Sequence, residues 1–431
     1  MKFLDNLKNL DFETLTKFSF LGGDRLTRGI TNFFNISVIS GALIASDYGE
    51  YAYFLLIYGL LDTVLSFGMP AILPMRISLM EKRNKLKLLF ISHNYKYLST
   101  ISFFIIFFFA SYLYNSFLNV EIFYLAIICV FFSNWSLTEA YFFSEMKQIT
   151  VSAIKIINSL LFLGIRIFLI YYVENLSLYD FILTYIFENL ILSLCLIFAT
   201  FHKKKDKQKN IFFKNNPDVH FFKNALTAWI SACLIIFYMR IDQIIISIVG
   251  TREDLAIYAV AAQLSELSFT LPMVISALYV GKLGSIFKDK NYGIFELELM
   301  KTYRIAFFSS IMVLPLIFFI FPLLFNYFYP TYLIESLKLF SIMCFSLPFV
   351  ALGVIHNISI ILEGKPEILL KKTLFTSIIA IPVCAFGWIE NKLYGLAIAI
   401  VFLQFFGNVL CVPLFDRKNF SLQIRAILLK N

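Results

Sequence analysis

The sequence contains about twelve continuous apolar runs, each long enough to cross a lipid bilayer, and this feature limits the fold more than any other. A helix of roughly 20 apolar residues spans the hydrocarbon core of a membrane. The runs cover residues 18–45, 51–74, 97–113, 122–143, 154–173, 179–200, 225–249, 258–283, 303–325, 337–362, 373–389 and 394–415. Because they are continuous rather than alternating, they predict helices and not a membrane barrel. We therefore predict an all-α integral membrane protein with about 12 transmembrane helices.

Positive charges between the runs predict on which side of the membrane each loop lies. Cytoplasmic loops are enriched in Lys and Arg. Most of the 37 Lys and Arg residues fall at the chain ends and in alternate loops, whereas only Arg252, Lys338 and Lys392 fall in the opposite loops. We expect a multi-pass protein of a bacterial inner membrane with both termini in the cytoplasm and no cleaved signal peptide. The net charge of +9 follows from these loops, so no nucleic-acid partner is expected.

The chain divides near its middle. The longest polar segment is a basic stretch that contains HKKKDKQK. We take residues 1–202 as an N-terminal six-helix lobe, 203–223 as a cytoplasmic linker and 224–431 as a C-terminal six-helix lobe. A D-x-x-x-Y-A pattern occurs at Asp47–Ala52 and again at Asp254–Ala259, each time in the outer turn after the first helix of a lobe. This repetition predicts two pseudo-symmetric bundles.

Four arginines fall inside apolar runs, namely Arg25, Arg28, Arg166 and Arg240. An arginine at the centre of the bilayer costs roughly 2.5 to 3.5 kcal/mol even on a lenient scale, so we expect these side chains to avoid lipid. Arg25 and Arg28 are three residues apart and therefore project from nearly the same side of a helix. Their planar guanidinium groups match the oxygen atoms of phosphate. An anion-binding cavity is the resulting hypothesis.

Each arginine also has a structural alternative. Arg25 and Arg28 lie near the start of their run, where they can extend to the inner interface or pair with Asp24. Arg240 can be neutralised by Glu266 on the next helix, at a similar distance from the outer turn. Arg166 has no acid within one helical turn, so its partner has to come from another helix or from a ligand.

Five acidic residues also fall inside the spans, namely Asp62, Glu139, Glu188, Asp242 and Glu266. Acids at such positions can carry a proton or bind a coupling cation in transporters. They can equally serve as counter-ions to the arginines. Coupling to H⁺ or Na⁺ therefore remains open, and neither a cofactor nor a metal site is expected. Soluble active-site patterns such as a P-loop or H-E-x-x-H do not occur, so we do not expect an enzyme.

Two stretches resemble a known family. Residues 23–70, with D-Y-G-E-Y at Asp47–Tyr51, look like the opening helices of the Wzx-type polysaccharide or O-antigen repeat-unit flippases in the multidrug/oligosaccharidyl-lipid/polysaccharide (MOP) exporter superfamily. Residues 239–267 are similar to the seventh and eighth helices of that family. Ala256 stands where the second turn of the family usually has glycine, so this second match is looser.

The resemblance implies a MATE-like fold, in which two bundles flank a central cavity and give access to one side of the membrane at a time. It implies a flippase that moves undecaprenyl-pyrophosphate-linked oligosaccharide from the cytoplasmic to the periplasmic leaflet. Arg25, Arg28 and Arg240 fall in the matched stretches and would hold the pyrophosphate, and the cost of burying Arg166 adds it to this set. The expected partners are the lipid-linked oligosaccharide and membrane lipids, with the polysaccharide polymerase machinery as an optional further partner.

Two other functions fit parts of the sequence. A MATE-type, cation-coupled drug antiporter shares the fold but requires cavity acids and few uncompensated arginines. A polytopic glycan polymerase or glycosyltransferase has a similar composition, but it generally carries a large external loop with catalytic residues. Every external connection predicted here is about a dozen residues or shorter. The flippase is therefore the leading hypothesis.

Overall fold

The computed structural model describes residues 27, 29–70, 73, 77, 82–113, 120–145, 148–202 and 219–429, and within these ranges every regular element is a helix. Arg25 and Arg28 lie outside the described residues. In the first half of the chain, a helix over residues 29–42 is followed by α3 (Ala45–Leu65), α5 (Lys82–Leu113), α6 (Val120–Phe132), α7 (Trp135–Ser144), α8 (Gln148–Tyr172) and α9 (Leu178–His202).

The second half of the chain continues with helices of very different lengths. They are α10 (Val219–Val249), α11 (Arg252–Ser268), α12 (Thr270–Lys288), α13 (Tyr292–Phe328), α14 (Ile334–Cys344), α15 (Leu347–Leu362), α16 (Pro366–Phe405), α17 (Val412–Phe415) and α18 (Arg417–Ile427). A short 3₁₀ turn (Thr331–Leu333) precedes α14, and a π-helical segment (Phe406–Leu410) follows α16.

The described residues account for the predicted spanning helices. Eight helical stretches are long and apolar enough to cross a membrane, and the pair α14 and α15, bent by 51°, makes a ninth. Helix α16 contains two helices that meet at a break in the backbone, while the helix at residues 29–42 and α3 overlap the first two predicted runs. The predicted fold class, an all-α membrane protein with about twelve spans, is confirmed.

The break in α16 is a tight turn between two helices. Asn391 and Lys392 have non-helical backbone angles, and Lys392 has a φ of 41°. On the two sides of the turn, a Cβ added at Gly387 would lie 2.6 Å from the carbonyl oxygen of Gly395. Only glycine allows the two backbones to approach this closely. The helices before and after the turn therefore form a hairpin, in agreement with the two runs predicted from the sequence.

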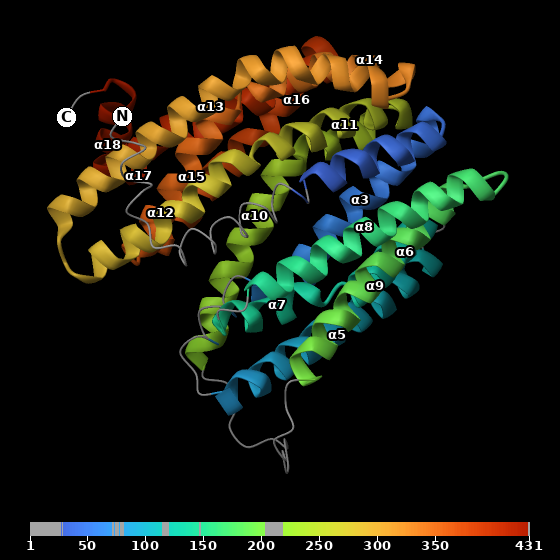
Figure 1. Cartoon of the computed structure of the whole chain (residues 1–431), viewed down its shortest axis with the longest axis horizontal. Helices are drawn as coiled ribbons and strands as arrows, with labels where there is room; N and C mark the ends of the chain where they lie inside the picture. Colours follow the sequence, from blue (N-terminus) through green and yellow to red (C-terminus); the bar gives the residue numbers. More distant parts are fainter. Residues whose placement is uncertain are drawn as a thin grey trace.

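The helices form two bundles joined by a shared central layer (Figure 1). In this view α5–α9 form one bundle and α12–α18 the other, while α3, α10 and α11 lie between them. We call residues 29–202 the N lobe and residues 219–429 the C lobe. The bundles approach each other near α3, α11 and α14 and lie farther apart near α7 and α12.

The lobes are in direct contact at the end of the molecule that carries the turns before α3 and α11, and we call this the closed end. Glu50 of α3 and Arg252 of α11 form an ion pair of 2.8 Å. The Arg252 guanidinium also lies 4.2 Å from the centre of the Tyr53 ring. A Cβ added at Gly49 would overlap the carbonyl group of Arg252. The two similar sequence patterns were predicted in outer turns, but they lie in the first turns of α3 and α11, and these two helices pack against each other.

Aromatic residues at the end of α13 extend this contact. Tyr329 donates its hydroxyl to the carbonyl of Phe33 at 3.1 Å, and Tyr332 donates to the carbonyl of Ser40 at 2.8 Å. The Phe33 ring meets the rings of Phe328 and Tyr329 edge to face. Edge-to-face packing is a favourable arrangement of aromatic rings. The closed end is thus sealed by polar and aromatic contacts between the two lobes.

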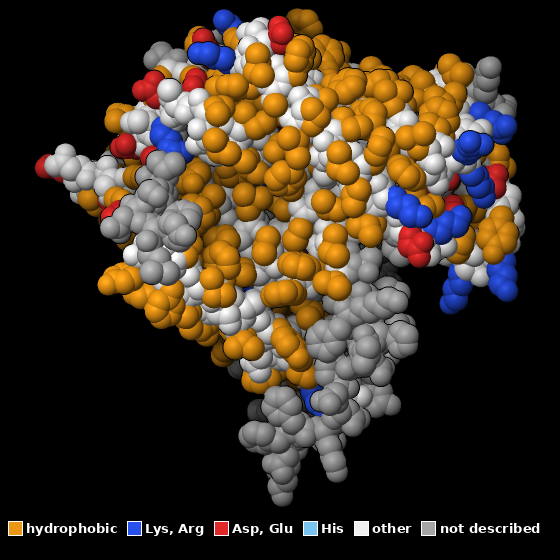
Figure 2. All heavy atoms as spheres, turned by 180° about the vertical axis from the view of Figure 1, so that it is seen from behind, with side chains coloured by type: hydrophobic (Ala, Val, Ile, Leu, Met, Phe, Trp, Pro, Cys, Tyr) orange, Lys and Arg blue, Asp and Glu red, His pale blue; other side chains and the backbone are white. Residues whose placement is uncertain are grey.

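The outer surface is that of a protein in lipid. Figure 2 shows a broad hydrophobic band across the molecule, with Lys and Arg side chains gathered mainly at one edge. On α13, the side chains of Phe319 and Leu323 are 78% and 74% exposed. An apolar surface of this extent is stable when lipid covers it. The protein is therefore a multi-pass membrane protein.

Candidate functional site

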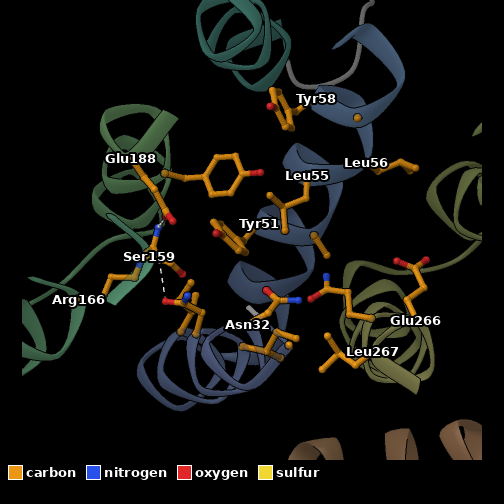
Figure 3. A pocket seen from close by; sticks show the side chains of 18 of the residues that line it. Asn32, Tyr51, Leu55, Leu56, Tyr58, Ser159, Arg166, Glu188, Glu266 and Leu267 are labelled. Atoms are coloured by element: carbon orange, nitrogen blue, oxygen red, sulfur yellow. Dashed lines mark hydrogen bonds and ion pairs between the residues drawn. The ribbon is translucent and has the colours of Figure 1, made fainter. Parts of the chain in front are cut away.

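A cavity of about 780 Å³ lies between the two lobes. Its lining comes from the helix at residues 29–42, from α3, α8 and α9 of the N lobe, and from α10, α11 and α12 of the C lobe. In Figure 3, Arg166 and Glu188 lie on one side and Glu266 on the other, with Tyr51 and Tyr58 of α3 between them. The cavity is therefore shared by both halves of the chain.

On the N-lobe side, Arg166 is buried in a network that engages each of its three guanidinium nitrogens. Its Nη2 atom lies 2.6 Å from Glu188 Oε2, its Nη1 atom 2.7 Å from Asn35 Oδ1, and its Nε atom 3.3 Å from Thr184 Oγ1. Only 1% of Arg166 is exposed. A buried charge is tolerated when it is both paired and hydrogen-bonded. Arg166 thus avoids lipid as expected, and its partner comes from another helix.

On the C-lobe side, Arg240 is more accessible and has a single carboxylate partner. Its Nη1 atom lies 2.8 Å from Glu266 Oε1, and its Nη2 atom lies 3.1 Å from Glu266 Oε2. The two side chains are 24% and 33% exposed. This is a two-point pair between a guanidinium and a carboxylate. The sequence left open whether Glu266 neutralises Arg240, and the structure shows that it does.

Two buried lysines of the N lobe are also paired with acids singled out from the sequence. Lys155, which lines the cavity, pairs with Glu139 at 2.6 Å. Lys96 is 1% exposed and pairs with Asp62 at 2.7 Å. The alternation of positive charge along the sequence counts both lysines with the cytoplasmic connections, and the structure shows that they lie within the helices α5 and α8. Each sits near the end of an apolar run, where hydropathy alone does not separate loop from helix.

The fifth acid, Asp242, is also hydrogen-bonded. Its carboxylate accepts a hydrogen bond of 2.7 Å from the Tyr258 hydroxyl and one of 2.8 Å from the backbone N–H of Gln243. Asp242 does not line the cavity, whereas the side chain of Gln243 does. Within the described residues, all five acids singled out from the sequence thus have a partner, and four of them are counter-ions to a Lys or Arg.

Several neutral polar residues of the lining were missed by the sequence analysis, which considered only charges. Amide side chains enter the cavity from both lobes: Asn32, Asn35, Asn158, Gln243 and Gln263. Four tyrosines also line it: Tyr48, Tyr51, Tyr58 and Tyr185. Amides both donate and accept hydrogen bonds. Amides that recur on the cavity-facing sides of several helices could have indicated this lining. A single sequence, however, does not show which helix faces meet in the folded protein.

Comparison with known proteins identifies the family. A family model described as "Polysaccharide biosynthesis protein" matches residues 26–279, which is more than half of the 431 residues. The chain belongs to this family. The match covers residues 26–70 of the first stretch that resembled the flippases of the MOP superfamily and all of the second, and it contains the charged residues that line the described cavity, from Lys155 to Glu266. No curated protein matches the sequence at a significant level.

Solved structures of MOP superfamily members share the fold of this family member. An inward-facing multidrug resistance MATE family transporter aligns with a TM-score of 0.69 and 16% identity, over 93% of this chain and 96% of the other. A MOP superfamily transporter from Pyrococcus furiosus aligns with a TM-score of 0.70 and 14% identity, over 94% and 96% of the two chains. An outward-facing MATE transporter gives 0.68 and 16%, over 95% and 96%. Family and fold are those of membrane transporters.

Proposed function

We propose that the protein is a lipid-linked oligosaccharide flippase of the Wzx type. It moves undecaprenyl-pyrophosphate-linked polysaccharide repeat units from the cytoplasmic to the periplasmic leaflet of the bacterial inner membrane. The observation that carries this proposal is a polar cavity of about 780 Å³ between two lobes, in a member of the polysaccharide biosynthesis family. The other enzymes of the same pathway determine which glycan is transported. The polysaccharide polymerase machinery is a proposed further partner.

The described state is inward-facing in the orientation that the Lys and Arg pattern predicts. The lobes touch at the end that carries Glu50 and Arg252, which is the outer end when both termini are cytoplasmic. The bundles are farther apart at the opposite end, where α12 and α13 are joined. A substrate from the cytoplasmic leaflet would therefore reach the cavity from that end and leave after the closed end opens.

The lining suits a head group that combines phosphate with sugar. Amides and tyrosines hydrogen-bond sugar hydroxyls, and tyrosine rings also offer flat apolar surface. Arg240 is the described cavity arginine best placed to meet a phosphate, because Arg166 is 1% exposed and each of its guanidinium nitrogens already donates to an acceptor. Arg25 and Arg28 stay predicted pyrophosphate ligands. The membrane potential favours this export, since an anion leaving a negative-inside cell gains about 2.3 kcal/mol per charge per 100 mV.

The drug antiporter is the nearest rival, since the aligned solved structures include multidrug transporters. A cationic drug requires an acid that is available to it. Both carboxylates that line the described cavity, Glu188 and Glu266, are already paired with arginine. Coupling to H⁺ or Na⁺ stays a proposal, in which the coupling ion would compete with arginine for these acids.

A ligand competition separates the two functions. Purified full-length protein in detergent is titrated with a prenyl-diphosphate oligosaccharide and, separately, with a fluorescent lipophilic cation. The flippase assignment predicts saturable binding of the diphosphate that the cation does not displace. Saturable binding of the cation, with no binding of the diphosphate, would instead establish the antiporter.

A further inference from the structure

The cavity contains two Arg–Glu pairs of the same chemistry, and they differ in how available the arginine is. Arg166 divides its donors among Glu188, Asn35 and Thr184 and is 1% exposed. Arg240 directs both terminal nitrogens at Glu266, and its side chain is 24% exposed. A ligand would have to break three sets of contacts to reach Arg166, but only one to reach Arg240. The two arginines therefore have different roles.

The geometry of the second pair is also the geometry of phosphate recognition. Two guanidinium nitrogens of Arg240 meet two carboxylate oxygens of Glu266 at 2.8 and 3.1 Å. A phosphoryl group presents two oxygens to the same fork. The Glu266 carboxylate consequently occupies the position that a phosphate of the ligand would take on Arg240.

We propose that Glu266 is a resident counter-ion that a diphosphate displaces from Arg240. This inference deepens the proposed function and rests on it for the lipid-linked source of the diphosphate. In the empty cavity, Glu266 neutralises Arg240. In the loaded cavity, the diphosphate binds the Arg240 guanidinium in place of Glu266. Competition from Glu266 limits the affinity of the protein for the diphosphate. A carrier has to release what it binds, and a competing carboxylate on the same lobe provides for release.

The surroundings allow Glu266 to leave Arg240 without becoming a buried unpaired charge. Its side chain is one-third exposed in the cavity. Gln263 and Thr270, one helical turn to either side of it along the chain, also line the cavity and can donate hydrogen bonds. The nearby acid Asp242 does not line the cavity, and its carboxylate accepts hydrogen bonds from Tyr258 and from the backbone of Gln243.

The test uses full-length protein in detergent and inorganic pyrophosphate, with binding measured by calorimetry at fixed ionic strength. Glu266→Gln should bind pyrophosphate about tenfold or more tightly than the parent, because a charge-assisted pair no longer has to be broken. Arg240→Gln should lose most of the binding. Glu253→Gln is the matched control: it removes the same charge from the same helix at an exposed position, and its affinity should not change.

The outcomes are decisive in both directions. An unchanged or weaker affinity in Glu266→Gln would overturn the proposal, and so would equal tightening in Glu253→Gln, which would reveal only a change in overall charge. Thermal unfolding of each variant shows whether it is folded, and Glu266→Ala serves as a second variant. A parallel titration with farnesyl diphosphate tests the source. If it binds no better than inorganic pyrophosphate, the lipid-linked function fails while the exchange at Arg240 can still hold.

Discussion

Arg166 connects three helices through one side chain. It belongs to α8, and it reaches Asn35 on the helix at residues 29–42 and both Thr184 and Glu188 on α9. Such a residue positions the wall of the cavity. Because it holds the N lobe together, its loss affects the stability of the protein as well as the ligand site.

Replacement of Arg166 by Met should lower the free energy of unfolding by about 3 to 5 kcal/mol, since Glu188 would keep a largely buried charge without its partner. Unfolding of the purified protein in detergent measures this loss. The double variant with Arg166→Met and Glu188→Leu should recover most of it, because both charges are then replaced by apolar groups. A single Arg166→Met variant as stable as the parent would contradict the positioning role.

At this scale, the sequence predicted which residues matter better than it predicted what they contact. The cost of burying charge singled out Arg166 and Arg240 without a structure. The pairing of Arg240 with Glu266 was open as an alternative, because the two residues lie on consecutive helices. The pairing of Arg166 with Glu188 could not be derived, because it depends on the rotation of α8 and α9 about their axes.

Among the elements, the contact between α3 and α11 controls the closed end. Gly49 faces the backbone of Arg252 so closely that no side chain fits between them. The same turn provides Glu50, which pairs with Arg252. A side chain at position 49 would force the two helices apart and would therefore favour the state in which this end is open.

Gly49→Val should increase the distance between the lobes at the closed end. Spin labels at Ile44 and Ile248, both well exposed, would measure this distance by pulsed electron spin resonance. Gly41→Val is the control, because a Cβ at Gly41 meets no atom within 4 Å. The gate interpretation predicts a longer distance in Gly49→Val alone. Identical distance distributions in Gly49→Val and the parent would contradict it.

The positions of the spanning helices were predictable from hydropathy, whereas their ends and most of the breaks were not. The hairpin inside α16 was predicted, because Asn391 and Lys392 interrupt two apolar runs. The bend between α14 and α15, and the break at Ser133 and Asn134 between α6 and α7, fall inside predicted runs that were taken as continuous. Such bends depend on how a helix packs against its neighbours. The apolar content of the sequence carries no information about this packing.

For the whole molecule, alternating access would break the contacts at the closed end. The lobes also touch at the other end of α3, where Trp229 of α10 donates to the carbonyl of Val64 at 2.8 Å. Opening requires the loss of the Glu50–Arg252 ion pair and of the hydrogen bonds from Tyr329 and Tyr332. Each of these contacts is modest by itself. Binding energy from a large ligand that touches both lobes can offset their loss, which is what alternating access requires.

The twelve-helix architecture followed from the sequence because each run satisfies its own backbone hydrogen bonds within the membrane. The buried arginines predicted a cavity, but its position between the two lobes followed only from the family resemblance, since no property of a single helix reveals a space between lobes. Its amide and tyrosine lining had to come from the structure.

The most direct test of the account is transport itself. Full-length protein is reconstituted into vesicles that carry a fluorescent prenyl-diphosphate oligosaccharide, and the loss of fluorescence to an added membrane-impermeant quencher is followed with time. The account predicts rapid loss of the inner-leaflet signal in vesicles that contain the parent protein and much slower loss with Arg240→Gln. Equal rates in protein-free vesicles and in vesicles with the parent protein would contradict the central claim.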